Sequence, residues 1–319
     1  MRVLALIAVV ACGSSSKQSA APILPHAAET PPTPDDVRAA VLDQYTQLSQ
    51  GYDSVYLEGL THDERLLLVG VRPVDLVAGY DANRAIGMFR LFGDEEIEIV
   101  SKDLEVHLSH DGTCAWVADD VSYRVLHGRR RAFLPFKLSA AYERREGRWL
   151  LVLLHLSYAV GSGVPAAQSG PALERPPKSV IESREADTVR KRVAAVLAGD
   201  DSAVSLEDDA LVIGPAGQRA TGRAVGKLAT PGELFPNAGT VEPTGIRVAF
   251  STSGTVAWAV ATLNVTATPA RASFVLEKRG GEWRVILMHV SRPARGDALA
   301  ADSGLTTPER PEPETPVEP

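Results

Sequence analysis

The sequence WLLVLLHLS at residues 149–157 returns later in the chain as WRVILMHVS at residues 283–291. Both stretches have the pattern Trp-x5-His-x-Ser, and apolar residues fill most of the other positions. Short apolar runs that follow glycine turns favour buried β-strands. A strand that occurs twice indicates an internal duplication, and this decides how the rest of the chain is divided.

A second pair of matching stretches precedes these strands. GTCAWVADDVSY at residues 112–123 matches GTVAWAVATLNV at residues 254–265 through the pattern Gly-Thr-x-Ala-Trp. The first tryptophans of the two copies are 142 residues apart (258 − 116), and the second are 134 apart (283 − 149). Because both anchors occur in one order at nearly equal separation, we expect two copies of one domain.

Each copy is predicted to begin with a helix and a short hairpin. The first helix starts at Thr33, with Pro34 at its first position and acidic residues in its first turn. Apolar residues then recur at helical spacing, at Val37, Val41, Tyr45 and Leu48 in the first copy and at Val189, Val193 and Val196 in the second, where Gly199 is the expected stop. Glycine-containing apolar runs at residues 65–82 and 209–225 predict the hairpins.

The remainder of each copy reads as antiparallel strands, beginning in the first copy with the alternating segment 96–109. The predicted fold class is therefore α+β, with two tandem domains, each a curved antiparallel sheet wrapped on N-terminal helices. We expect domain 1 at residues 33–160, a Gly/Pro-rich linker at 161–178, domain 2 at 179–295 and a disordered Pro/Glu-rich tail at 296–319.

Strict alternation along the repeated strand predicts which side chains share a face. It groups Trp149, Leu151, Leu153, His155 and Ser157 on one face, and the equivalent residues on the corresponding face of the second copy. The opposite face of the strand in the first copy is also apolar, so we expect both faces of that sheet to be covered.

The N-terminus is typical of an exported protein. Arg2 precedes nine apolar residues and Cys12, so residues 1–11 are predicted to be a signal peptide. The run Val9-Val10-Ala11-Cys12 resembles the bacterial lipobox, which implies a lipid anchor at Cys12 and a flexible tether over residues 12–32; an ordinary signal peptide is the alternative. The expected location is the cell envelope, facing the periplasm. Gly13 favours the outer membrane over the inner one under the enteric sorting rule.

Composition excludes several classes of function. The chain of 319 residues has a formal net charge of −7, which does not suit a nucleic-acid-binding protein. Its two cysteines, Cys12 and Cys114, exclude a zinc cluster and a disulfide framework, and Cys114 is predicted to be buried and inert. The phosphate-binding, zinc-protease and serine-hydrolase motifs do not occur, and we predict neither a cofactor nor a metal.

Together, Gly-Thr-x-Ala-Trp, Trp-x5-His-x-Ser and the stretch LVGVRPVDLVAGYDA (68–82) resemble SnoaL-like domains of the nuclear transport factor 2-like, or cone-fold, superfamily. The resemblance covers residues 35–160 and, more weakly, 183–294. It implies a pocket enclosed by the concave face of the sheet and the helices, with the other face packed on a second copy, here as an intramolecular pseudo-dimer. Proteins with this fold include isomerases, cyclases, dehydratases, assembly domains and ligand-binding proteins, so the resemblance leaves the activity of this chain open.

His155 and His289 have two interpretations. Each imidazole could act as a base or a hydrogen-bond donor in a cone pocket. Alternatively, each could be structural and tie the last strand to the helix layer through the following serine. Their presence in both copies favours the structural interpretation.

The other candidate pocket residues are the tryptophans and two charged groups. Trp116, Trp149, Trp258 and Trp283 could line a pocket, although strand tryptophans more often pack in the core. Asp119 and Arg131 are the candidate polar groups of domain 1, because the second copy has Ala261 and Thr262 where the first has Asp119 and Asp120. Only one of these adjacent acids can face the pocket. The arginines at 129–131 form either a solvated hairpin tip or an anion site.

The leading hypothesis is an envelope-tethered module that binds a small apolar ligand or an envelope protein. The alternative is an enzyme of the SnoaL or ketosteroid-isomerase kind, a proton-transfer isomerase, cyclase or hydrolase with its site in domain 1. An enzyme would need a His–acid or Tyr–acid pair in an open cavity. A third interpretation is a structural spacer whose pockets are filled by side chains.

Overall fold

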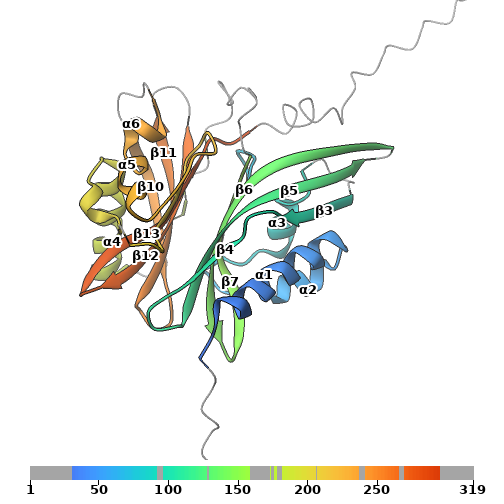
Figure 1. The fold of residues 1–319 in the computed structure, drawn as a ribbon, viewed down its shortest axis with the longest axis horizontal. Coiled ribbons are helices and arrows are strands. Elements are labelled where there is room, and N and C mark those ends of the chain that lie inside the picture. Colours follow the sequence, from blue (N-terminus) through green and yellow to red (C-terminus); the bar gives the residue numbers. More distant parts are fainter. Residues whose placement is uncertain are drawn as a thin grey trace, which may run out of the picture. The chain divides into compact units, whose positions relative to one another are not determined.

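The computed structural model of this chain describes residues 31–91, 96–127, 129–158, 173, 176–177, 182–205, 207–236, 241–265 and 269–294. It confirms the α+β class: two successive domains each have helices at the N-terminal side of a mixed sheet. In Figure 1 the helices of the first domain (blue) lie alongside its sheet (green). The signal peptide, Cys12, most of the tether, nearly all of the linker and the tail lie outside the described residues.

Domain 1 has three helices and seven strands among its described residues. These are α1 (Pro34–Ser49), α2 (Asp53–Glu58), β1 (Leu67–Val69), β2 (Leu76–Ala78), α3 (Ala82–Gly87), β3 (Glu96–Ser101), β4 (Glu105–Leu108), β5 (Cys114–His127), β6 (Arg130–Arg145) and β7 (Arg148–Tyr158). The segment 96–109 forms two strands with a break between them, as its alternation predicted, and both strands pair with β5.

Domain 2 repeats this strand order, and its last three strands are shorter than their counterparts in domain 1. Its described elements are α4 (Arg184–Leu197), the 3-10 helix η1 (Asp201–Ala203), β8 (Leu211–Ile213), β9 (Arg219–Thr221), the 3-10 helix η2 (Gly222–Ala224), α5 (Val225–Leu228), α6 (Pro231–Leu234), β10 (Val241–Phe250), β11 (Val256–Val265), β12 (Ala270–Arg279) and β13 (Glu282–Ser291). The helix stop is confirmed, because Gly199 follows α4 at φ +94°.

The two sheets have matching topologies. Sheet A has the order β2-β1-β7-β6-β5-β3, with β4 also paired to β5, and sheet B has the order β10-β11-β12-β13-β8-β9. In each sheet a three-residue strand of the early hairpin runs parallel to the last long strand, β1 beside β7 and β8 beside β13. The predicted hairpins at 65–82 and 209–225 thus contribute the strand pair at one edge of each sheet.

Helix α1 forms where its sequence signals placed it. Thr33 caps the helix by accepting a hydrogen bond from the Asp36 amide, and the Asp36 carboxylate accepts one from the Thr33 amide, which is a complete capping box. The apolar residues at helical spacing face the sheet and are buried, and they pack with the concave face of sheet A in the first cone core. In domain 2 the valines of α4 do the same against sheet B.

The predicted faces of β7 and β13 are wrong in one respect. Ala141 of β6 pairs with Leu153, but its neighbour Tyr142 pairs with Leu151, so Val152 is the extra residue of a β-bulge. The bulge reverses the alternation, and Trp149 and Leu151 therefore lie inside the cone with Leu154 and Leu156. Leu153 lies on the opposite face, which β7 also shares with His155.

An equivalent bulge occurs in domain 2. Val275 pairs with Leu287 and Leu276 pairs with Val285, which leaves Ile286 as the extra residue. Trp283 and Val285 consequently pack inside the second cone, whereas Leu287 lies on the outer face. A one-residue register change moves every following side chain to the other face, and this is what the strict alternation rule could not anticipate.

The outer faces of the two sheets pack on each other. A third apolar cluster, separate from the two cone cores, joins residues from both domains. Its largest side chains are Trp116 and Trp258, each almost fully buried. We call this cluster, together with the polar contacts around it, the interdomain interface. None of the described helices is both long and apolar enough to cross a bilayer.

Candidate functional site

The repeated histidines meet at the centre of the interdomain interface. The rings of His155 and His289 stack with their centroids 3.9 Å apart and their planes 18° from parallel, and neither residue is exposed to solvent. The bulges in β7 and β13 turn both rings away from the cone interiors. The interpretation in which each histidine ties its strand to the helix layer is therefore wrong, because each contacts the other domain.

Four serines bind the two rings, and each ring uses serines of the opposite domain. The Nδ1 and Nε2 atoms of His155 lie 2.9 and 2.7 Å from the hydroxyls of Ser273 and Ser291. The Nδ1 and Nε2 atoms of His289 lie 2.9 and 2.7 Å from the hydroxyls of Ser139 and Ser157. Since Ser139 pairs with His155 in sheet A and Ser273 pairs with His289 in sheet B, the arrangement has local two-fold symmetry. We call these six residues the histidine centre.

Burial makes both rings neutral at physiological pH. Loss of solvent lowers the pKa of His155 well below its usual range, and the nearby His289 and Arg271 lower it further. Burial, with a smaller contribution from Lys137, lowers the pKa of His289 to about 3. Each imidazole then offers one donor and one acceptor, which its two serine hydroxyls complement. With every ring nitrogen engaged and no solvent access, the centre is suited to structure rather than to proton transfer with a substrate.

The first tryptophan of each copy also serves the interface. The indole N–H of Trp116 donates to the Asp209 carbonyl at 3.0 Å, and that of Trp258 donates to the Arg65 carbonyl at 2.7 Å. The second tryptophans lie elsewhere: Trp149 packs in the first cone core. Trp283 packs in the second and donates to Glu185 at 2.7 Å. The four candidates thus divide between interface and cone walls.

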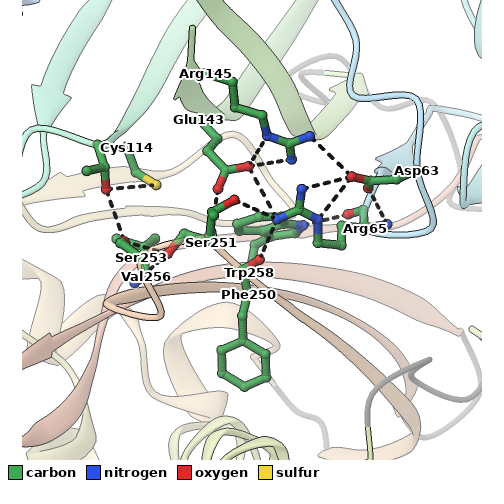
Figure 2. Close-up of polar contacts among 12 residues, drawn as sticks. Asp63, Arg65, Cys114, Glu143, Arg145, Phe250, Ser251, Ser253, Val256 and Trp258 are labelled. Carbon is green, nitrogen blue, oxygen red and sulfur yellow. Dashed lines mark hydrogen bonds and ion pairs between the residues drawn. The ribbon is translucent and has the colours of Figure 1, made fainter. Parts of the chain in front are cut away.

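Two buried glutamates, which sequence reasoning did not single out, complete the interface. The carboxylate of Glu143, only 2% exposed, accepts a 2.7 Å bond from Arg145 Nε and a 2.5 Å bond from the Thr252 amide of the other domain. Figure 2 shows it between Arg145 and Arg65, with Asp63 bridging the two arginines on the far side.

Glu277 occupies the equivalent position in domain 2. It accepts a 2.7 Å bond from Arg279 Nε and a 2.7 Å bond from the His110 amide of domain 1. The signal in the sequence was available, because Glu-x-Arg occurs at the same position of both copies, six residues before the second tryptophan. These acids close the interface on either side of the histidine centre.

Asp119 faces the first cone, and Asp120 faces outward, where its carboxylate binds Lys137 at 2.6 Å. Asp119 is fully buried and accepts hydrogen bonds from the Tyr45 hydroxyl at 3.3 Å and from the amides of Lys102 and Asp103 at 3.3 and 3.0 Å. Burial raises the pKa of its carboxyl above the usual range. Because those amides belong to the break between β3 and β4, Asp119 holds this bend in place.

The interior of the first cone is nearly filled. A cavity of about 10 Å³ remains beside Tyr45, Tyr56 and Tyr142, which is about the room that one water molecule requires. The Tyr45–Asp119 contact is a Tyr–acid pair of the kind that proton chemistry uses, but the cavity of about 10 Å³ that Tyr45 lines is too small for an organic substrate.

An open groove of about 820 Å³ lies at the end of domain 1. It is lined by the end of α1 and the two residues after it (49–51), Arg90, the start of β3 (96–98), the end of β5 (124–126) and the start of β6 (131–133). Arg131, predicted as a pocket residue, lies at this groove and is exposed, whereas Asp119 does not line it. The groove thus combines an apolar floor, including Val125 and Ala132, with charged residues at its rim.

Two further predictions concern Cys114 and metals. Cys114 is 2% exposed, and burial raises the pKa of its thiol to about 12, so it is buried and unreactive as predicted. Within the described ranges, no group of three or more His, Cys, Asp or Glu side chains is placed to hold a metal ion.

Solved structures with similar folds each match about one domain's length of the chain. A putative calcium/calmodulin-dependent protein kinase II association domain from Xanthomonas campestris is 19% identical, with 40% of this chain and 88% of that chain covered and a TM-score of 0.35. A putative dehydratase of the NTF2-like family from Streptomyces avermitilis is 14% identical (40% and 97% covered, TM-score 0.35). An NTF-2-like protein of unknown function from Shewanella oneidensis is 18% identical (39% and 97% covered, TM-score 0.30).

The family model of the SnoaL-like domain matches this chain twice, at residues 39–161 and 191–295. No curated protein matches the chain. The first matched segment begins within α1 and the second within α4, and together they contain every strand of the two sheets. Since they cover more than half of the sequence, this protein belongs to the SnoaL-like domain family and contains two tandem copies of the domain.

Proposed function

We propose that this protein is a binding module whose ligand site is the groove at the open end of domain 1, and that domain 2 supports domain 1 through the interdomain interface. The observation that carries the proposal is the groove of about 820 Å³, which falls in the size range of small-ligand sites. Its apolar floor and charged rim suit a small, largely apolar ligand with a polar group.

The residues that an enzyme would use have other roles. In the histidine centre, all four ring nitrogens of His155 and His289 are hydrogen-bonded to serine hydroxyls. Asp119 bonds the β3–β4 bend and Tyr45 beside a cavity of about 10 Å³. General acid–base catalysis requires such groups within hydrogen-bond reach of a substrate, so this arrangement favours binding over proton-transfer chemistry.

Native mass spectrometry of residues 20–300, purified from an envelope extract of the source organism, tests the binding proposal. We expect a retained small molecule that is lost in Ala132→Trp, which fills the groove floor, and weakened in Arg131→Ala at the rim. Leu42→Trp, which adds an indole to the exposed side of α1, and Lys191→Ala on α4 are the matched controls. A ligand that stays bound in both groove variants would contradict the proposal.

We propose in addition that the protein is held at the cell envelope by a lipid on Cys12, facing the periplasm and more readily at the outer than the inner membrane. The support is the sequence alone: Arg2, the apolar run before Cys12 and the Ser/Ala/Pro-rich segment after it. Cys12→Ser should abolish incorporation of labelled palmitate and move the protein from the membrane to the soluble fraction. Unchanged membrane association in that variant would contradict the anchor.

A further inference from the structure

The histidine centre contains no group that could neutralise a charged imidazole. Facing it are Lys137 from β6 and Arg271 from β12, both cationic. The strands β7 and β13 contribute the rings themselves and the hydroxyls of Ser157 and Ser291, while β1 and β8 contribute apolar side chains beside the rings.

The acids near these cations are already engaged. Asp120 binds Lys137 at 2.6 Å, and Asp75 binds Arg72 at 2.9 Å. Arg271 itself donates to main-chain carbonyls of the Arg72–Asp75 turn in domain 1. An imidazolium formed in the centre would therefore be buried beside Arg271 and the Lys137–Asp120 ion pair, neither of which can neutralise it.

The stacking of the His155 and His289 rings makes a charged imidazole still less favourable. With ring centroids 3.9 Å apart, a charge on one ring directly opposes a charge on the other. Protonation also removes the acceptor nitrogen of the ring, so the serine that donates to it in the neutral state must turn its proton elsewhere. Neither the repulsion between charged rings nor the lost hydrogen bond opposes protonation once the two sheet faces separate and water reaches the rings.

From this arrangement we propose that the histidine centre is an acid-sensitive latch, in which protonation of His155 and His289 releases the two domains from each other. The domains are suited to separation because each cone has its own apolar core, and neither core contains the histidines. The cluster that would become exposed is the one shared between the sheets, including Trp116 and Trp258.

The direction of the pH effect follows from linkage. Both histidines have a lowered pKa in the closed state and regain about 6.5 when solvated, so the separated state binds more protons below pH 6.5. Closure is thus fully favoured above pH 6.5 and weakens as the pH falls toward about 3, the pKa of His289 in the closed state. The opening equilibrium should rise up to about tenfold per pH unit for each ring and about 100-fold for both.

An acid titration of the full chain tests the proposal, with the tryptophans as local reporters. In a Trp149→Phe/Trp283→Phe background the remaining indoles, Trp116 and Trp258, both lie in the interdomain interface. Between pH 7 and 4.5 we expect their emission to shift to longer wavelength, and the radius of gyration from X-ray scattering to increase, at a higher pH than the loss of sheet signal in far-UV circular dichroism. A single transition in all three signals would overturn the proposal.

Replacing His155 and His289 gives a second test of the proposal. His155→Asn/His289→Asn should remove most of the pH dependence of opening between pH 6.5 and 4.5, whereas His62→Asn, at an exposed histidine outside the interface, should leave it unchanged. If the double variant does not fold, nitrogen-15 spectra of the imidazoles in the unmodified chain decide the question. Protonation of both rings near pH 6.5 with the domains still closed would overturn the proposal; rings that stay neutral until the domains open would support it.

Discussion

The interdomain interface and the cone interiors differ in how closely the two copies correspond. Across the interface, equivalent positions hold the same groups: His155 and His289 with their serines, Trp116 and Trp258 with their carbonyl acceptors. Inside the cones, equivalent positions of the corresponding strands β5 and β11 hold different groups, with Asp119 in domain 1 where domain 2 has Ala261.

The contrast follows from what each surface must match. A face that packs on a copy of itself has to be self-complementary, so a change at one position alters contacts on both sides of the two-fold axis. A cone interior has to match only its own helices, and Tyr123 in one copy can be Val265 in the other. The groove lies at the end of domain 1 that the second copy does not constrain.

The largest effect should come from truncating the histidine centre. His155→Ala removes a buried ring and leaves Ser273 and Ser291 without partners, at an expected cost of about 4–5 kcal/mol. His289→Ala should cost the same within about 1 kcal/mol, because its contacts are related by the two-fold axis. Denaturant unfolding of both variants measures this. If the two variants lost amounts of unfolding free energy that differ by several kcal/mol, the two rings would occupy symmetric positions without contributing equally to stability.

The double variant sharpens the same comparison. Since the two rings are in direct contact, His155→Ala/His289→Ala should destabilise the protein by less than the sum of the single costs. A strictly additive result would mean that the stacked rings do not stabilise each other.

Next in size are the buried glutamates. Glu143→Gln removes the charge that Arg145 and Arg65 neutralise but retains the shape of the side chain, and we expect a loss of about 3 kcal/mol. Glu277→Gln should lose a similar amount through Arg279. Because the glutamates are buried and their arginine partners are only partly exposed, raising the salt concentration to 1 M should change either loss little. A loss in either variant that disappears at high salt would contradict the buried-pair interpretation.

A smaller effect is expected at the interface tryptophans. Trp116→Phe and Trp258→Phe each remove one indole donor and leave a carbonyl, of Asp209 or Arg65, without its partner. We expect about 1–2 kcal/mol for each in thermal or denaturant unfolding. Trp149→Phe, which keeps an aromatic ring in the cone wall, is the control and should cost less.

Much of the fold was predictable because its signals are local or repeated. The capping box at Thr33, the valines at helical spacing in α4 and the glycine that ends it are each encoded within a few residues. The duplication was visible because Trp-x5-His-x-Ser occurs twice. These features gave the element order and the fold class, which the described residues confirm.

The position of the histidines could not be predicted in the same way. A β-bulge at Val152 depends on how β7 pairs with β6, and nothing in WLLVLLHLS itself marks the extra residue. The partners of His155 lie more than 100 residues away, at Ser273 and Ser291. A useful signal was nevertheless present, because a serine occurs sixteen residues before each histidine as well as two residues after it.

The smallest change in stability should be found on replacing Asp119. This replacement tests whether the Asp119 carboxyl is structural or catalytic. In Asp119→Asn the amide oxygen can still accept from the Lys102 and Asp103 amides, so we expect a change of less than about 1 kcal/mol at pH 7.

The raised pKa of Asp119 means that its carboxyl binds a proton more readily in the folded state. The stability that this carboxyl contributes is therefore present below its unfolded pKa of about 3.9 and is lost as the pH rises through its pKa in the folded state. Asp119→Asn should therefore be relatively less stable than the parent in acid and close to it at neutral pH, as difference measurements of unfolding at about pH 3 and pH 7 would show. Ligand retention in the groove should be unaffected, because Asp119 does not line it. If this variant instead lost bound ligand while remaining folded, the cone interior and the groove would be one site, and the first domain would differ from the second in function as well as in packing.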